Sequence, residues 1–578
     1  MPQANDRVAA LLDEYAELMQ MAGSDQFRIR TYTKAARAIS AYQGDVAELP
    51  AASLLQIPGV GKSIAAKVAE VLATGSFSEL EERRADIPDG VRQLTRIPAL
   101  GPRRALQLYQ QLQISSPEQL REAIDAGKLR DLKGFGAKSE EKLLRGIDLL
   151  ERAGGRVLLN VAAETAAAVI EAVAAVPGCQ RIAPAGSLRR AKESIGDVDV
   201  LVAGDDSAPL MAALTAMPQA AEVIASGPTK TSIRTAAGLQ VDLRVVRLDS
   251  WGAALQYFTG SQEHNVRIRE LAVRRKLKLS EYGLFDAETG ELIVSRTEEE
   301  VYQRLGMQWI PPTLREDTGE VAAALRHELP ELVTESDVRG DLHSHTNLTD
   351  GQASLEDMVA AARAKGYEYY AITDHAPDLV MQRMTDEKML AQREQVRSLG
   401  ERLAADGGRP MTLLHGTELN IGPDGSVDWP AGFLAGFDIC VASVHSHFDQ
   451  TRAEMTRRFL TACENPHVNV IGHPLTRKIG RCPPVDVDLG ELFRACARTG
   501  TALEVNAHPA RLDLPSAHIR AARDAGVRFA VDTDAHSVRD LGYLQYGIAT
   551  AQRGWLTAQD VITTWPLPQL AEFLRKDH

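Results

Sequence analysis

The chain of 578 residues is too long for a single hydrophobic core, so several compact domains are expected. Hydrophobic residues make up 44% of it and charged residues 25%, which is ordinary for a soluble globular protein, and no apolar run reaches the length that a membrane-spanning helix needs. The formal charge of −13 argues against a protein that holds nucleic acid through a broad basic surface.

The five cysteines show no C-x-x-C pairing, so neither a disulfide framework nor a thiolate zinc site is expected. The first residues are polar and acidic with helical periodicity, unlike a secretory signal. Both features favour a cytoplasmic protein whose cysteines are reduced and structural.

Helical periodicity predicts helices over residues 6–22 and 30–42. Three turns with the frame apolar-x-Gly/Ala-apolar-Gly follow, starting at Ile57, Ile97 and Leu132, and each precedes a helical stretch. Each resembles a helix-hairpin-helix turn, in which glycines permit a tight hairpin and expose N–H groups of the second helix to a phosphate. One such turn could be a plain connection between packed helices, but three indicate a region that grips the DNA backbone.

We therefore expect residues 1–151 to form a helical DNA-binding region of two small domains, 1–85 and 86–153. The glycines expected at the phosphate contacts are Gly59, Gly61, Gly101, Gly134 and Gly136. Oriented N–H groups bind phosphate without a strongly basic surface, which reconciles DNA binding with the negative net charge.

The stretch 186–200 places a Gly-Ser turn, two arginines and two carboxylates close together. Asp197 and Asp199 are two apart, so in a strand both side chains lie on one face and can hold divalent cations. Gly186-Ser187 and the arginines Arg189 and Arg190 offer donors for phosphate oxygens. An exposed acidic strand after a loop is the alternative for the D-x-D pair alone.

A second strand, 238–246, alternates in hydrophobicity and supplies Asp242 as a third carboxylate. Three carboxylates with two metal ions form the arrangement for in-line nucleotidyl transfer, in which one metal activates a 3′-hydroxyl and the other neutralises the triphosphate.

Together with Tyr257–Ser261, His264-Asn265 and Arg269, these motifs resemble the family X DNA polymerases, the family of DNA polymerase beta, over about residues 1–316. The resemblance implies an α+β palm (154–248) and a thumb-like nucleotide-selection domain (249–316). It implies Asp197, Asp199 and Asp242 as catalytic ligands of Mg²⁺ or Mn²⁺. It also implies nucleotide contacts: Ser187, Arg190 and Gly196 to the triphosphate, Tyr257, Phe258 and Gly260 to the deoxyribose, and Asn265 and Arg269 to the incoming base and the template minor groove.

At two places the sequence departs from the pattern of the family, and there the implied residue roles are less secure. Gln240 stands where the family has an arginine close to the third carboxylate. Lys67 falls at the Schiff-base lysine of the family's lyase domain, with Tyr32 in the motif pattern, but Ser63 replaces a phosphate-binding lysine. A lyase nucleophile and an ordinary solvated lysine both remain open for Lys67.

Residues 317–337 are expected to be a linker, and a last domain follows at 338–578. There, seven apolar runs alternate with helical segments, and nearly every run ends in histidine or carboxylate. The runs end at His345, His375, Glu418, His445, His473, Asn506 and His536. This alternation predicts a parallel sheet closed into a distorted (β/α)7 barrel, with the polar residues converging on one mouth.

The elements H-x-H, D-H, G-x-E, V-H-S, G-H-P and D-A-H resemble the PHP (polymerase and histidinol phosphatase) domain. The resemblance implies a trinuclear site of Zn²⁺ and/or Mn²⁺ that hydrolyses phosphoesters. Its ligands would be His343, His345, Asp350, His375, Glu418, His445, His473, Asp534 and His536. Glu504 could be a ligand or structural, and the other histidines of this half are taken as structural.

The resulting hypothesis is a bacterial, nucleoid-associated DNA polymerase that fills short gaps in DNA repair and trims 3′ ends by 3′–5′ exonuclease activity. Its expected partners are gapped or primer–template DNA and dNTPs, and it would act as a monomer. The alternatives are a metallophosphatase of small phosphate esters and a DNA-binding scaffold with inactive centres.

Overall fold

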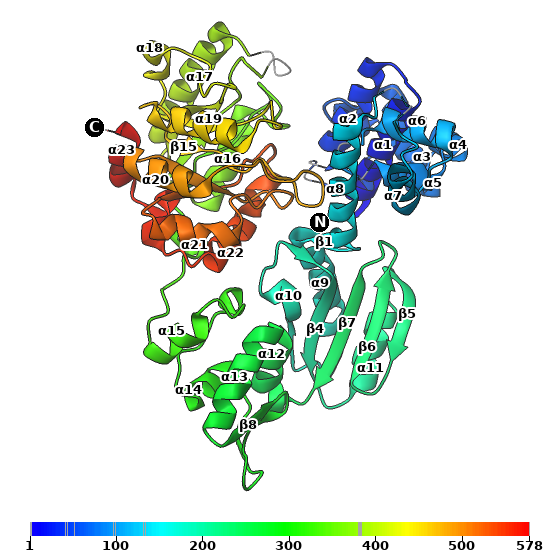
Figure 1. The fold of residues 1–578 in the computed structure, drawn as a ribbon, viewed down its shortest axis with the longest axis vertical. Coiled ribbons are helices and arrows are strands. Elements are labelled where there is room, and N and C mark those ends of the chain that lie inside the picture. Colours follow the sequence, from blue (N-terminus) through cyan, green and yellow to red (C-terminus); the bar gives the residue numbers. More distant parts are fainter. Residues whose placement is uncertain are drawn as a thin grey trace.

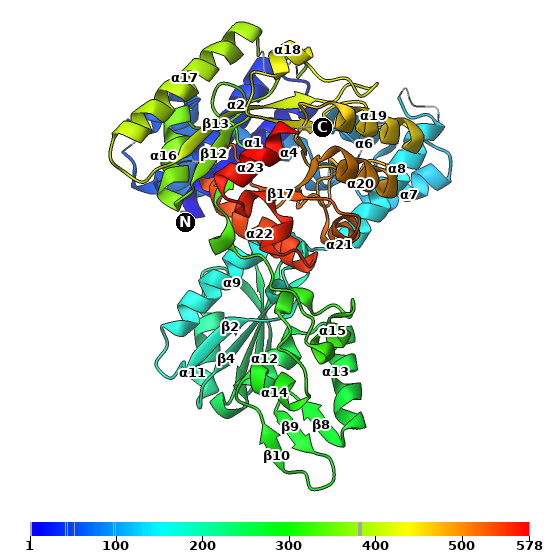
Figure 2. The same ribbon diagram turned by 90° about the vertical axis from the view of Figure 1, so that its left-hand side faces the viewer.

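The computed structural model describes residues 3–40, 42, 44–50, 52–95, 97–98, 100–130, 132, 134–379 and 384–576. Ala99 and Lys133 of the expected turns, and the outermost residues of the first and last expected domains, lie outside the described residues. Figures 1 and 2 show the N-terminal helices and the C-terminal barrel together at one end of the molecule, with the palm and thumb at the other.

In the N-terminal region, the secondary structure of the described residues is helical. Its helices are α1 (Gln3–Met21), α2 (Gln26–Ser40), α3 (Lys62–Thr74), α4 (Ser78–Asp86), α5 (Asp89–Leu94), α6 (Pro102–Leu112), α7 (Pro117–Asp125) and α8 (Ala137–Ala153), with short 3₁₀ turns η1 (Val46–Glu48) and η2 (Ser53–Gln56). One buried apolar cluster runs through it from Val8 to Ile147, so the two expected domains share a core.

The three expected hairpin turns precede α3, α6 and α8, whose N-caps are Gly61, Gly101 and Gly136 in extended conformation. Gly59 and Gly134 have φ of 83° and 95°, a region in which glycine is strongly favoured. The sequence frame thus marks real helix starts.

The palm is a five-stranded sheet in the order β2-β4-β7-β6-β5. Its strands are β2 (Arg181–Pro184), β4 (Asp197–Ala203), β5 (Ala220–Ser226), β6 (Lys230–Thr235) and β7 (Gln240–Val246), and β4 and β7 run parallel. Apolar side chains of α9 (Leu159–Ala174) and α11 (Ser207–Thr215) pack on it. A short pair, β1 (Val157–Leu158) with β3 (Ser194–Ile195), precedes β4, and α9 begins directly after β1.

The thumb consists of α12 (Trp251–Thr259), α13 (Gln262–Arg274), the antiparallel strands β8 (Leu277–Ser280), β9 (Gly283–Asp286) and β10 (Leu292–Val294), and α14 (Glu298–Arg304). The segment expected as a linker contains α15 (Glu320–Arg326), whose Ala323 and Ala324 belong to the thumb core. The thumb core therefore extends into residues 317–337.

The C-terminal domain is a barrel of seven parallel strands in chain order. They are β11 (Gly340–Asp341), β12 (Tyr369–Ile372), β13 (Thr412–Asn420), β14 (Ile439–Ser443), β15 (Val470–Ile471), β16 (Ala502–Asn506) and β17 (Phe529–Asp532). A parallel bridge between Ser344 and Ala535 links the ends of the first and last strands. The predicted (β/α)7 barrel is confirmed.

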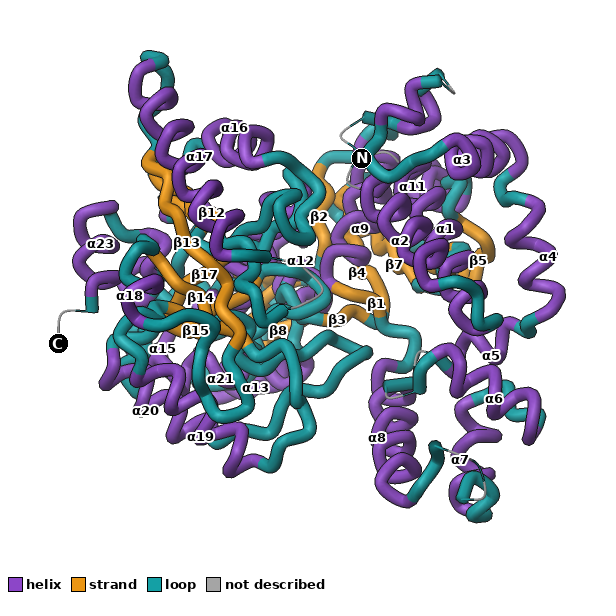
Figure 3. The backbone as a smooth tube through the Cα atoms, turned by 90° about the horizontal axis from the view of Figure 1, so that it is seen from above, coloured by secondary structure: helices purple, strands orange, loops and turns teal. Residues whose placement is uncertain are grey.

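Helices surround the strands on the outside of the barrel, and the last two follow the final strand (Figure 3). They are α16 (Leu355–Lys365), α17 (Asp386–Ala405), α18 (Ala431–Leu434), α19 (Arg452–Glu464), α20 (Leu489–Thr499), α21 (Ser516–Asp524), α22 (Leu544–Arg553) and α23 (Leu567–Arg575). Among the described residues, no helix has the length and apolar character that a membrane span requires.

The barrel contacts both other parts of the chain. Arg477 donates to Glu193 of the palm at 2.6 Å, and Arg539 donates to Asp6 of α1 at 2.9 Å. Leu512 of the barrel is buried in the apolar cluster of the palm. These contacts hold the barrel beside the palm and the N-terminal helices.

Candidate active sites

The three predicted carboxylates of the palm meet at one end of the sheet. The register of β4 and β7 pairs Asp199 with Asp242, and Asp197 lies two residues before Asp199 on the same face. Each offers an oxygen, and these oxygens lie within 4.8 Å of one another. Burial, together with the charges of Asp197 and Asp242, raises the pKa of Asp199 to about 6. A bound cation would relieve this repulsion, so the cluster fits the predicted metal site.

Asp242 also has two partners within the protein. Nζ of Lys230 lies 2.5 Å from one carboxylate oxygen, and Nε2 of Gln240 donates to the other at 3.0 Å. Burial alone would raise the pKa of Asp242, but the hydrogen bonds of Lys230, Ser232 and Gln240 lower it. Sequence reasoning singled out Gln240 and missed Lys230, because only the pairing of β6 with β7 brings that ammonium to the carboxylates.

Gly186 begins α10 (Gly186–Arg189) directly over the carboxylates. Its φ is +57°, and a Cβ added to it would lie 2.2 Å from Oδ2 of Asp199. Only glycine permits this close approach, which brings the backbone of Gly186 and Ser187 next to the metal-binding face. The predicted phosphate contact at Ser187 thus lies beside the predicted metal ligands.

Both arginines of the predicted phosphate site are held by carboxylates of the thumb side. Arg189 donates to both oxygens of Glu298 at 2.8 Å, and buried Arg315 donates to the same carboxylate at 2.6 Å. Burial alone would raise the pKa of Glu298, but Arg315 and Arg189 lower it to about 2. Arg190 donates to the carbonyl of Thr259 at 2.6 Å and to Glu316 at 3.0 Å.

The predicted sugar and base contacts come from α12 and α13. Tyr257 and Phe258 lie edge to face on α12, and Arg244 of β7 lies over the Phe258 ring at 4.5 Å. Gly260 follows them next to Arg190, whose Nη1 would lie 3.0 Å from an added Cβ. Asn265 donates to the carbonyl of Tyr257 at 2.7 Å, which ties α13 to α12.

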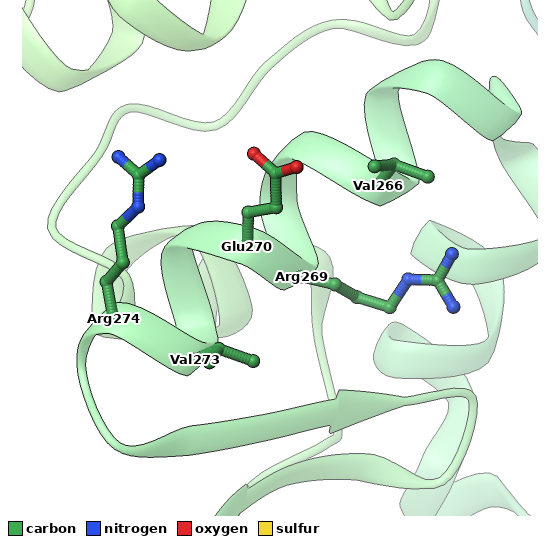
Figure 4. A pocket seen from close by; sticks show the side chains of 5 residues that line it. All are labelled: Val266, Arg269, Glu270, Val273 and Arg274. Atoms are coloured by element: carbon green, nitrogen blue, oxygen red, sulfur yellow. The ribbon is translucent and has the colours of Figure 1, made fainter.

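Arg269 lies one turn after Asn265 and donates to its carbonyl at 3.3 Å. Figure 4 shows it on an open face of α13 lined by Val266, Arg269, Glu270, Val273 and Arg274, with Arg269 and Arg274 pointing to opposite sides. Val273 is 70% exposed there. This face is accessible to a nucleic acid backbone or groove.

All nine predicted PHP ligands meet at the mouth of the barrel. They form three overlapping groups, namely His345, Asp350, His375 and His536; His343, His345 and Asp534; and His375, Glu418 and His445. The ninth, His473, has its Nε2 at 3.0 Å from Glu418.

The chemistry of this cluster fits metal ions. Among the described residues, buried Nδ1 atoms of His345 and His473 and Oδ1 of Asp350 have no hydrogen-bond partner. Burial alone would lower the pKa of His375, but Glu418 and Asp350 raise it to about 10. Burial alone would also lower the pKa of His536, but Asp350 and Asp534 raise it to about 9. The carboxylates thus favour positive charge in their midst, which bound cations supply.

Glu504, which the sequence left open, lies beside the cluster and orients it. One oxygen is 2.6 Å from Nδ1 of His343, and the other accepts hydrogen bonds from the backbone N–H of His473 and from Asn506. A proton on Nδ1 leaves Nε2 of His343 free for a metal.

Arg511 is a residue of this mouth that sequence reasoning missed. Its Nε lies 3.7 Å from Oδ2 of Asp534. The segment that carries it, N-A-H-P-A-R, has no periodic signal that distinguishes it from any loop. By contrast, the histidines taken as structural, His415, His447, His467, His508 and His518, belong to none of the ligand groups found in the described part of the chain.

Lys67, the candidate lyase nucleophile, is 7% exposed and forms an ion pair with Glu79. The ring of Phe77 lies 5.5 Å from its ammonium. In this arrangement the amine is engaged by Glu79, and it would have to leave that pair to attack a substrate.

The fold and the two clusters define a nucleotidyltransferase joined to a metal-binding phosphoesterase barrel. Family models agree: a helix-hairpin-helix domain matches residues 3–77, a SAM-like helix-hairpin-helix tandem 91–148, a DNA polymerase beta thumb 254–316 and a PHP domain 341–508.

The "DNA polymerase/3'-5' exonuclease PolX" of Bacillus subtilis (strain 168) is 34% identical over 573 residues, 99% of both chains. DNA polymerase lambda of Rattus norvegicus is 26% identical over 54% of this chain and 56% of its own length. A probable phosphatase of Shewanella sediminis is 26% identical over 41% of this chain and 94% of its own. The chain therefore belongs to the family X DNA polymerases that carry a C-terminal PHP domain.

Proposed function

We propose that this protein is a DNA-directed DNA polymerase that fills short gaps during DNA repair and that its barrel removes nucleotides from 3′ ends. One observation carries the proposal: a single chain holds a three-carboxylate cluster on the palm sheet and a nine-residue histidine–carboxylate cluster at the barrel mouth. The full-length similarity to a polymerase/3′–5′ exonuclease supports the pairing of these two activities.

In the palm, Asp197, Asp199 and Asp242 would hold two Mg²⁺ or Mn²⁺ ions. These ions would activate the primer 3′-hydroxyl and neutralise the triphosphate of the dNTP. The backbone N–H groups of Gly186 and Ser187 would donate hydrogen bonds to its oxygens. Lys230 must release Asp242 when the metals bind, and Arg190 must exchange Glu316 for a phosphate. Phe258, supported by Arg244, would form the wall against the deoxyribose.

In the barrel, the nine clustered residues would hold Zn²⁺ and/or Mn²⁺, with three overlapping groups for three ions. Such ions supply a hydroxide near neutral pH and stabilise the charge of a five-coordinate phosphorus. The chain's own contribution is orientation: Glu504 fixes the ring of His343 and the backbone of His473. Arg511 would bind a negatively charged oxygen of the phosphodiester.

We also propose the domain limits given by the sequence, 1–85, 86–153, 154–248, 249–316 and 338–578, with α15 assigned to the thumb. The hairpin glycines would contact the phosphates of gapped or primer–template DNA. With chromosomal DNA as substrate, the protein would act at the bacterial nucleoid, as a monomer.

The two rivals are a phosphatase of small esters and an inactive scaffold. The phosphatase relatives align with only 41% of the chain, which leaves the palm carboxylates without a role. An assay with a labelled primer in gapped DNA distinguishes the proposed function from these two alternatives. We expect extension with dNTPs and shortening without them in Mg²⁺ or Mn²⁺, and neither after EDTA. Rapid hydrolysis of small phosphomonoesters without change to the primer would favour the phosphatase, and binding alone the scaffold.

A further inference from the structure

Three successive loops form one side of the barrel mouth. Because β14, β15 and β16 are neighbours in the sheet, the loops after them lie side by side at its carboxyl edge. The first carries Phe448, an aromatic side chain that is 53% exposed. The second carries the exposed cations Lys478 and Arg481, and the third carries Arg511.

These loops extend from the barrel cluster toward the palm. Arg511 reaches Asp534 at 3.7 Å, and the backbone N–H of Ile479 donates to the carbonyl of Ala510 at 2.7 Å, which joins the second loop to the third. On the other side, Arg477 donates to Glu193 of the palm at 2.6 Å. Glu193 precedes β3 and the metal-binding strand β4, so the loops extend from one cluster to the segment that leads to the other.

Positive charge gathers along this path, although the chain as a whole carries −13. Partial desolvation, then the charges of Arg511, Arg481 and Arg37, lower the pKa of Lys478. Arg37 belongs to α2 of the N-terminal helices, and the facing carboxylates are Asp13 and its neighbour Glu17 on α1. Lys478, Arg481 and Arg511 lie close enough to one another for their charges to interact, which favours a polyanion along these loops.

The helix that follows the third hairpin turn lies next to the same mouth. Lys142 of α8 is 3.9 Å from Asp449, the residue after Phe448. Figure 1 shows loops of the barrel reaching toward α8. A strand held by the Gly134–Gly136 turn would therefore pass the exposed ring.

We propose that these loops form a binding surface for a single-stranded 3′ end of DNA, along which the strand passes from the palm to the barrel. Phe448 stacks on a base, Lys478 and Arg481 contact phosphates, and Arg511 contacts the phosphate nearest the metal cluster. An exposed aromatic ring can stack only on unpaired bases, so the surface would bind a single strand. The inference rests on the proposed 3′–5′ exonuclease function, for which it names the substrate path.

The test measures binding of a short fluorescent oligothymidylate by anisotropy in EDTA, so that no strand is cut. F448A weakens binding roughly tenfold, because base–aromatic stacking supplies about 1–3 kcal/mol per base. The double variant K478A/R481A lowers the slope of log affinity against log salt by about 1.4, since each lost phosphate contact contributes about 0.7. The matched controls on the thumb are Y282A, whose ring is 65% exposed, and K276A.

The inference would be overturned if F448A bound the oligonucleotide as tightly as Y282A. It would also be overturned if K478A/R481A showed the same salt dependence of binding as K276A. Hydrolysis of bis(p-nitrophenyl) phosphate in Mn²⁺ serves as the check on the cluster itself and is expected to be unchanged in F448A. If the wild type fails to shorten labelled 3′ ends, the proposed exonuclease function falls, whereas the binding measurements still decide whether the surface exists.

Discussion

Gly186 offers the sharpest test of how the palm is assembled. In Gly186→Ala, the new Cβ meets Oδ2 of Asp199 at 2.2 Å, so the carboxylate or α10 must move by about 0.8 Å to reach the 3.0 Å that real Cβ contacts allow. A displacement of this size at reacting groups can reduce a rate by about 100-fold. The φ of +57° adds a strain of roughly 1–2 kcal/mol to the folded state.

Gly238→Ala is the matched control, because Gly238 also has a positive φ, +86°, but an added Cβ would meet nothing within 4 Å. Both variants should lose about the same stability in urea unfolding. Only Gly186→Ala should lose about 100-fold in primer extension at saturating dNTP, and it should retain 3′-end shortening. Equal extension rates in the two variants would refute the assignment of Gly186 to the metal-binding face.

Three further outcomes follow from charged contacts. Glu504→Gln should weaken metal retention by the barrel about 10–100-fold, measured as bound metal after dialysis, because His343 loses its orienting carboxylate; full retention would make Glu504 a bystander. Glu316→Gln should lower the KM for dNTP several-fold, because Arg190 would no longer have to break an ion pair with Glu316 before it binds the triphosphate. An unchanged KM would contradict this change of partner. Glu298, whose pKa is lowered to about 2 from 4.5, contributes stability that is complete above pH 4.5 and is lost as the pH falls toward 2, about 3 kcal/mol in all. The stability gap to Glu298→Gln should therefore narrow over that range, and a constant gap would disprove the ionised pair.

The sequence predicted much of the fold because metal chemistry restricts what can stand at strand ends. A histidine or carboxylate at the end of a buried apolar run has few structural reasons to recur at six of seven strands, so the barrel was predictable from the pattern. Its nine candidate ligands came from the resemblance to the PHP domain. The carboxylates Asp197 and Asp199 were predictable for the same reason: the two-residue period of a strand puts both on one face.

The residues that sequence reasoning missed depend on contacts between distant segments. Lys230 reaches Asp242 only through the register of β6 and β7, in which Ser232 faces Asp242. Glu316 meets Arg190 and also Arg553, which donates to it at 3.0 Å from α22 of the barrel. No local pattern encodes the packing of α22 against the thumb end, so neither the partner of Arg190 nor the packing of α15 could be read from sequence.

The central claim is that one chain extends and shortens DNA at two separate metal clusters. A labelled primer assay with Asp197→Ala and His343→Ala tests it directly, with Asp205→Ala and His467→Ala as controls outside both clusters. We expect Asp197→Ala to lose extension and keep shortening, His343→Ala to lose shortening and keep extension, and both controls to keep both activities. Loss of both activities from either single change would contradict the two-site account.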